Sequence, residues 1–129
     1  MNLKILLSVY AVFATASGAA LLLIPSTIFS SSMYGLPPLD DLETSLARSV
    51  GAAFVGLGVM CWAARTAEVS KARDALMLGL MVANGLGAVV SAMSAGGNWV
   101  IWAEAGFLAL VAVLFIVIGR QGKVILSKT

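Results

Sequence analysis

Histidine is absent from this 129-residue sequence, and cysteine occurs only once, at Cys61. Without histidine the chain cannot form a bis-histidine haem site, a histidine metal site or a histidine general base. A single cysteine excludes an intramolecular disulfide and a CxxC redox pair. The sequence also lacks a Walker loop, a GxSxG elbow and paired carboxylates spaced for catalysis. We therefore expect no enzymatic activity, no catalytic residues, no metal and no cofactor.

Charged residues are scarce as well, at 11% of the chain, whereas 60% of the residues are hydrophobic. The mean hydropathy of +1.02 is typical of an integral membrane protein and not of a soluble domain. The net charge of +2 requires no nucleic-acid partner, because the basic residues flank apolar runs, where they meet anionic lipid. Membrane lipids are the expected surroundings.

The sequence contains four long apolar runs, at residues 3–24, 46–64, 75–95 and 99–119. Each is close to the ~20 residues that an α-helix needs to cross about 30 Å of hydrocarbon. None shows the strict alternation over about ten residues that is typical of a membrane β-strand. We predict an all-α integral membrane protein, an antiparallel four-helix bundle forming a single domain over residues 1–129.

Positive charge is concentrated on one side of these runs. Seven of the eight basic residues lie at the start of the first run, between the second and the third, or after the fourth: Lys4, Arg65, Lys71, Arg73, Arg120, Lys123 and Lys128. The opposite connections, residues 25–42 and 95–98, have no basic residue. The positive-inside rule then predicts cytoplasmic N and C termini in the inner (plasma) membrane. So strong a bias disfavours the dual insertion of some small exporters and fluoride channels.

The N-terminal run also fits a cleaved signal peptide, with Lys4, an apolar stretch and Ala14-Thr15-Ala16 as the cleavage site. The apolar run continues past that site to Ile24, which favours an uncleaved membrane helix.

The connection at residues 25–42 mixes serines with large apolar residues: Ile28, Phe29, Met33, Tyr34 and Leu36. It predicts a short interfacial helix that begins at Pro25 and ends at Gly35. Asp40 followed by Glu43 predicts a capping box, so the second long helix should begin at Asp40 or Asp41. The connection is either an ordered link or a lid over the bundle.

Two ionisable side chains are set into the apolar runs, Arg48 and Glu104. Counted from Arg65 and Arg120, both lie about one turn below the outer membrane surface. A charge at that depth is costly unless it is paired or reaches the surface. We predict a salt bridge between the second and fourth runs, with further hydrogen bonds from Ser91, Ser94 or Asn98. The alternative is that Arg48 reaches the headgroups alone and Glu104 stays protonated at a lipid-facing edge.

Small residues on three of the runs predict the faces that pack together. These faces comprise Tyr10, Ala14, Ser17 and Gly18 on the first run; Arg48, Gly51, Ala52 and Val55 on the second; and Asn84, Gly87, Ala88 and Ser91 on the third. Asn84 lies near the membrane midplane, so its amide must bond across helices or contact a ligand. Trp99 and Trp102 mark the outer interface, and Trp62 the inner one.

The stretches LARSVGAAFVGLGVMCWAAR (46–65), NGLGAVVSAMSAGGNW (84–99) and WAEAGF (102–107) resemble small bacterial four-helix membrane proteins of the DoxX-like type and neighbouring domains of unknown function. The resemblance implies an antiparallel four-helix bundle. It transfers no catalytic residue, and it implies that a shared site would lie at the polar starts of the second and fourth runs, at Arg48 and Glu104.

Two functions follow as hypotheses. In the first, the chain is an accessory or structural subunit that packs against another membrane protein or against itself. In the second, it is a binding protein or minor transporter that holds a small lipophilic or ionic ligand near the outer face, lined by Arg48, Glu104, Asn84 and Ser91. The second hypothesis requires a cavity open at the outer face.

Overall fold

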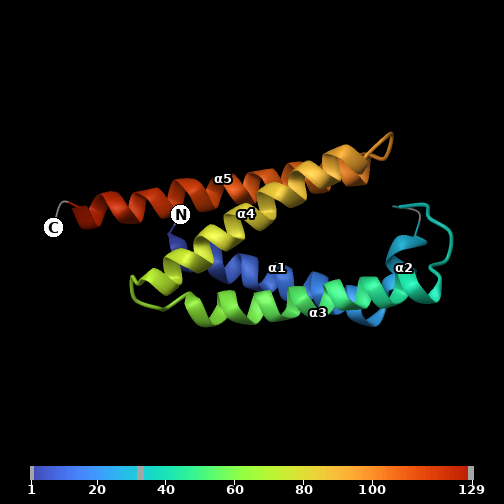
Figure 1. The fold of residues 1–129 in the computed structure, drawn as a ribbon, viewed down its shortest axis with the longest axis horizontal. Helices are drawn as coiled ribbons and strands as arrows, with labels where there is room; N and C mark the ends of the chain where they lie inside the picture. The colour runs from blue at the N-terminus through green and yellow to red at the C-terminus, as the bar shows by residue number, and fades with distance from the viewer. Residues whose placement is uncertain (1, 32–33, 128–129) are drawn as a thin grey trace. The chain divides into compact units, whose positions relative to one another are not determined.

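The computed structural model describes residues 2–31 and 34–127, and for residues 121–127 only the path of the helix. In these ranges it contains five helices and no strand (Figure 1): α1 (Leu3–Leu23), α2 (Pro25–Phe29), α3 (Asp41–Ala64), α4 (Lys71–Ser94) and α5 (Trp99–Ser127). Four segments are long and apolar enough to cross a membrane, namely α1, α3, α4 and the Trp99–Arg120 part of α5. The all-α prediction with four spans is thus confirmed. Met33 and Lys128 lie outside the described residues.

The chain forms two compact units, each built on one helical hairpin. Lys4–Thr66 contains α2, α3 and almost all of α1. The second unit comprises Ala67–Thr129 with Met1–Leu3 and contains α4 and α5. The single domain over residues 1–129 stays a prediction.

The helices α1 and α3 run antiparallel and pack through glycines (Figure 1). A Cβ atom built on Gly51 would lie 2.7 Å from the carbonyl oxygen of Gly18 and 2.7 Å from the backbone nitrogen of Leu22. Two turns away, a Cβ atom on Gly58 would lie 2.9 Å from the carbonyl oxygen of Ala11. Gly51 and Gly58 are seven residues apart, as are Ala11 and Gly18, so the small residues meet at matching levels. The two backbones therefore approach closely, as membrane helices do at small residues.

This packing defines the buried faces of the first hairpin. On α1, Tyr10, Ala14 and Gly18 are buried as predicted, whereas Ser17 of the same predicted face is half-buried. On α3 the buried positions are Gly51, Gly58 and Cys61. The packed face of α3 follows these residues and leaves Arg48 and Ala52 exposed beside it, because the α1 glycine and alanine set the register.

The helices α4 and α5 form the second hairpin, joined by a tight turn at residues 95–98. Gly96 takes a left-handed backbone, with φ of 49°, and the Asn98 Oδ1 accepts a hydrogen bond of 2.9 Å from the Val100 N–H in the first turn of α5. A Cβ atom on Gly87 would lie 3.1 Å from the Leu108 Cδ1, and one on Gly119 would lie 3.9 Å from the Met77 Cε. The hairpin is therefore antiparallel over its whole membrane length.

The start of α3 has the predicted capping box. The Glu43 N–H donates to the Asp40 Oδ1 at 2.7 Å, and the Asp40 N–H donates to the Glu43 Oε2 at 3.0 Å. These bonds satisfy two backbone donors and begin the helix at Asp41 with Asp40 as its N-cap.

The short helix α2 begins at Pro25 as predicted, but it ends at Phe29 and not at Gly35. The hydroxyl groups of Ser30 and Ser31 donate to the carbonyl oxygens of Ser26 and Ile28. Such side-chain bonds offer the backbone an alternative to further helix. Gly35 instead forms a turn with φ of 63°, and the Leu36 N–H donates to the Phe29 carbonyl oxygen at 3.2 Å.

Candidate functional site

Each hairpin has one basic end and one end without basic residues. In the first hairpin the antiparallel order puts Lys4 and Arg65 at one end and the acidic start of α3, Asp40 to Glu43, at the other. In the second hairpin the positive charge lies at the start of α4, on Lys71 and Arg73, and at the end of the α5 span, on Arg120. Its opposite end is the uncharged turn at residues 95–98. The charge asymmetry of the sequence thus becomes an asymmetry of each folded unit.

Arg48 lies on α3 beside the face that packs against α1, and it is exposed. It is seven residues from the first residue of α3, or about 10 Å along the helix axis. It is 17 residues from Arg65, or about 26 Å. Within its own unit, over the described residues 4–31 and 34–66, its guanidinium forms no ion pair. Arg48 thus takes no part in the packing of its own hairpin.

Glu104 lies on α5, five residues after Trp99, and is also exposed. It is 16 residues from Arg120, or about 24 Å, so it lies as far from its basic end as Arg48 does from its own. The contacts of Gly87 with Leu108 and of Met77 with Gly119 set a register in which Glu104 is level with Ser91. Ser91 is half-buried. The second hairpin therefore presents a carboxyl group and a hydroxyl group at one level.

Asn84 is the one buried polar side chain of the described residues, with only 3% of its surface exposed. Its Nδ2 donates to the Leu80 carbonyl oxygen at 2.7 Å. The register places it level with the buried Val111 and Ala112 of α5. The amide therefore satisfies a donor within its own helix while it lies in the α4–α5 seam.

The interfacial tryptophans have defined partners. The Arg65 guanidinium lies 3.5 Å from the Trp62 ring centroid, and its Nη1 donates to the Trp62 carbonyl oxygen at 2.7 Å. At the other end, the Trp102 Nε1 donates to the Gly96 carbonyl oxygen at 3.2 Å. These contacts fit side chains held at the boundary between polar and apolar surroundings.

Arg73, which nothing in the sequence pattern distinguishes from the other basic residues, also has a particular environment. The Arg73 Nη1 donates to the Ala67 carbonyl oxygen at 3.0 Å, so the side chain folds back over the connection before α4. Its Nε is buried and has no hydrogen-bond partner among the described residues. The positive charge of Arg73 was visible in the sequence, but this arrangement depends on the path of the chain between α3 and α4.

The structure brings Glu104 and Ser91 to one level and places Asn84 in a packed seam, and the Arg48–Glu104 salt bridge stays a prediction. Within the described ranges, 2–31 and 34–127, no group of three or more cysteine or acidic side chains could hold a metal ion.

No curated protein and no solved structure matches this chain. A family model described as a domain of unknown function, DUF8292, matches residues 1–121. This match supports the broader part of the resemblance noted above, and it does not support the DoxX-like assignment. The chain belongs to the DUF8292 family, a domain of unknown function.

Proposed function

We propose that this chain is a non-enzymatic multipass membrane protein that acts as an accessory or structural subunit of a membrane assembly. The observation that carries the proposal is the exposure of Arg48 and Glu104 on membrane-spanning helices. Hydrocarbon cannot solvate either charge, so each must be covered by protein or reach the headgroups. A protein surface at that level would provide the cover.

The apolar surface of the spans supports the same function. Large hydrophobic side chains are exposed on every long helix, for example Phe13 at 46%, Val59 at 60% and Leu110 at 57%. Lipid alone could cover such side chains, but lipid does not select for charged or small groups beside them. Ala52, one turn from Arg48 and also exposed, leaves room for a neighbouring helix there. The combination of charge and small residues favours a protein partner, either another membrane protein or a second copy.

Site-specific photo-crosslinking in cells tests this proposal. A photoreactive residue at Ala52 would lie on the Arg48 side of α3, and one at Val50, also exposed, would lie at the same depth on the opposite flank. We expect the Ala52 probe to give one crosslinked species of defined mass that contains a second protein in fixed stoichiometry. The Val50 probe should give much less of it, and Arg48→Ala should abolish it.

Other outcomes of this experiment distinguish the alternatives. Crosslinks formed only within one copy of the chain would contradict the accessory role. A small-molecule adduct at Ala52 that depends on Arg48 would favour the ligand-binding function in its place.

The proposed orientation has both termini in the cytoplasm of the inner membrane, supported by the basic ends of the two hairpins. Residues 66–70 can span at most about 18 Å, less than the hydrocarbon thickness of about 30 Å, so both basic ends must share one membrane side. In a Cys61→Ala background, an impermeant maleimide should label Gly97→Cys in intact cells and leave Ala67→Cys unlabelled. The reverse pattern would refute the orientation.

A further inference from the structure

The first turn of α4 carries a basic group that the packing of its hairpin does not use. Arg73 lies three residues after the N-cap Ser70, whose hydroxyl accepts a hydrogen bond of 3.2 Å from the Arg73 N–H. The Nη1 bond to Ala67 holds the guanidinium over the connection that precedes the helix. Lys71 lies two residues earlier and is exposed. Two positive charges thus lie at the boundary where a membrane span begins.

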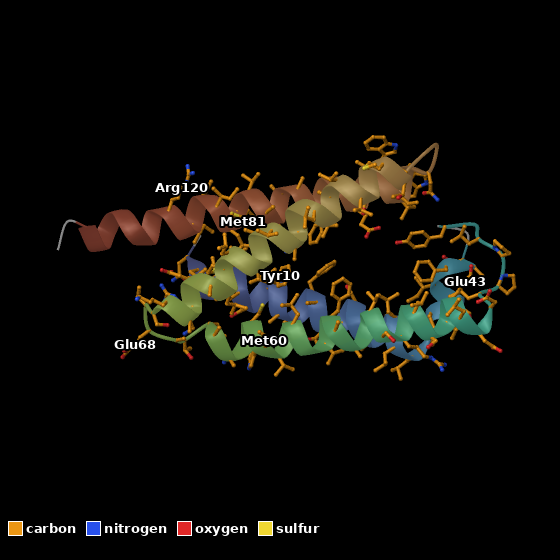
Figure 2. The ribbon with its side chains drawn as sticks, viewed as in Figure 1. Tyr10, Glu43, Met60, Glu68, Met81 and Arg120 are labelled. Carbon is orange, nitrogen blue, oxygen red and sulfur yellow. The ribbon has the colours of Figure 1, made fainter. Side chains whose placement is uncertain are left out.

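The nearby carboxylates do not neutralise Arg73. Glu68 and Asp74 are both exposed, and in the part of the chain that the structure describes neither forms an ion pair with Arg73. Figure 2 shows Glu68 in the connection between α3 and α4, pointing away from the helices. Apart from the Nη1 bond to Ala67, the N–H groups of the guanidinium have no partner in the described chain, and because Nε is buried, the Nη groups are the ones left for an anion.

We propose that Arg73 and Lys71 bind the phosphate of an anionic phospholipid at the start of α4. A guanidinium presents its N–H groups as a planar fork that matches two phosphate oxygens, and Lys71 adds a point charge. The N-terminus of the 24-residue helix α4 adds favourable electrostatic potential for an anion. The bond to Ala67 lowers the conformational freedom that Arg73 would lose on binding.

The position of this group favours a lipid headgroup. The candidate span begins at Lys71 itself, so both side chains lie at the level of headgroup phosphates when α4 crosses the bilayer. The inference rests on the membrane placement of α4 in the proposed function and does not depend on the accessory role. A failed partner crosslink would leave it standing, and a failed lipid experiment would leave the accessory role standing.

Native mass spectrometry of the full chain in non-ionic detergent tests the proposal. The protein is mixed with equal amounts of phosphatidylglycerol and phosphatidylcholine that have the same acyl chains. We expect the wild type to retain phosphatidylglycerol preferentially, and Arg73→Gln to lower its bound-to-free ratio about tenfold without changing phosphatidylcholine binding. Arg73→Lys keeps the charge but loses the fork, so its ratio should fall between the two.

Arg120→Gln is the matched control, because it removes the same charge from an exposed residue of the same hairpin. Figure 2 shows Arg120 on the side of α5 turned away from α4, so this change should alter the ratio less than twofold. Far-UV circular dichroism verifies that each variant is folded, and Lys71→Gln replaces Arg73→Gln if the latter is not.

Three results would overturn the proposal. They are an absence of lipid preference in the wild type, an equal loss in the Arg73 and Arg120 variants, and displacement of phosphatidylglycerol by millimolar inorganic phosphate. The last result would identify a site for a free anion.

Discussion

Replacing Gly51 with alanine tests the packing of α1 against α3. The added Cβ atom would lie 2.7 Å from two backbone atoms of α1, whereas ordinary contact begins at 3.4 Å. Backbone atoms cannot rotate away, so the helices must separate by about 0.7 Å at this level, and a gap of that size loses a quarter to a half of each dispersion contact. Overpacking of this kind costs about 1–3 kcal/mol.

The single cysteine of the chain provides the assay. Cys61 is fully buried on the same face of α3, so a thiol reagent reaches it only when the hairpin opens. If labelling follows the opening equilibrium, a loss of about 1–3 kcal/mol should raise the rate of Cys61 modification by about 5-fold to 150-fold. The rate is measured with a small maleimide in detergent under native conditions.

Gly56→Ala is the control, because Gly56 lies on the same helix and a Cβ atom there would have no neighbour within 4 Å. This variant gains the same helix propensity as Gly51→Ala without the clash, so its Cys61 should be modified at or below the wild-type rate. Equal rates for the two variants would refute the close approach of α1 and α3. Gly18→Ala should behave as Gly51→Ala does, and the double variant should cost less than the sum, because one substitution already separates the backbones.

Three further predictions concern two single side chains and one pair. Asp40→Ala should lower the free energy of unfolding by about 1 kcal/mol through loss of the capping box, and Asp41→Ala should not; equal thermal midpoints would contradict this. Asn84→Ala should cost about 1–3 kcal/mol in the same measurement, because it removes a buried, hydrogen-bonded amide, and an unchanged midpoint would argue against its burial. If Arg48 and Glu104 pair, their double alanine variant should lose less stability than the sum of the single losses, and additive losses would refute the pairing.

Much of the fold follows from the sequence by local rules. Hydropathy over about 20 residues fixes the spans, and Asp40 with Glu43 fixes the start of α3, because both effects act within one helix. The predicted end of α2 was wrong, because serine hydroxyl groups compete for nearby carbonyl oxygens. A hydropathy pattern contains no information on such hydrogen bonds.

The packed face of α3 was harder to predict, because it depends on two helices at once. Several positions of α3 carry glycine or alanine, and each could have faced α1. To choose the packed face, the spacing of small residues on both helices must be compared. Ala11 and Gly18 on α1 match Gly51 and Gly58 on α3 at the same seven-residue interval. A search for matching intervals of small residues on consecutive runs would have found this register.

The same register bears on the candidate site. The face of α3 that packs against α1 contains Gly51 and Gly58, and Arg48 lies outside it. The charge of Arg48 therefore makes no contribution to the packing of the hairpin. An arginine that only completed this packing would be buried in it, with its donors satisfied by the hairpin. Glu104 is exposed on its own helix at an equivalent distance from the basic end. Both charges are therefore surplus to the folding of their hairpins, which is the reason to look for their role in what the hairpins bind.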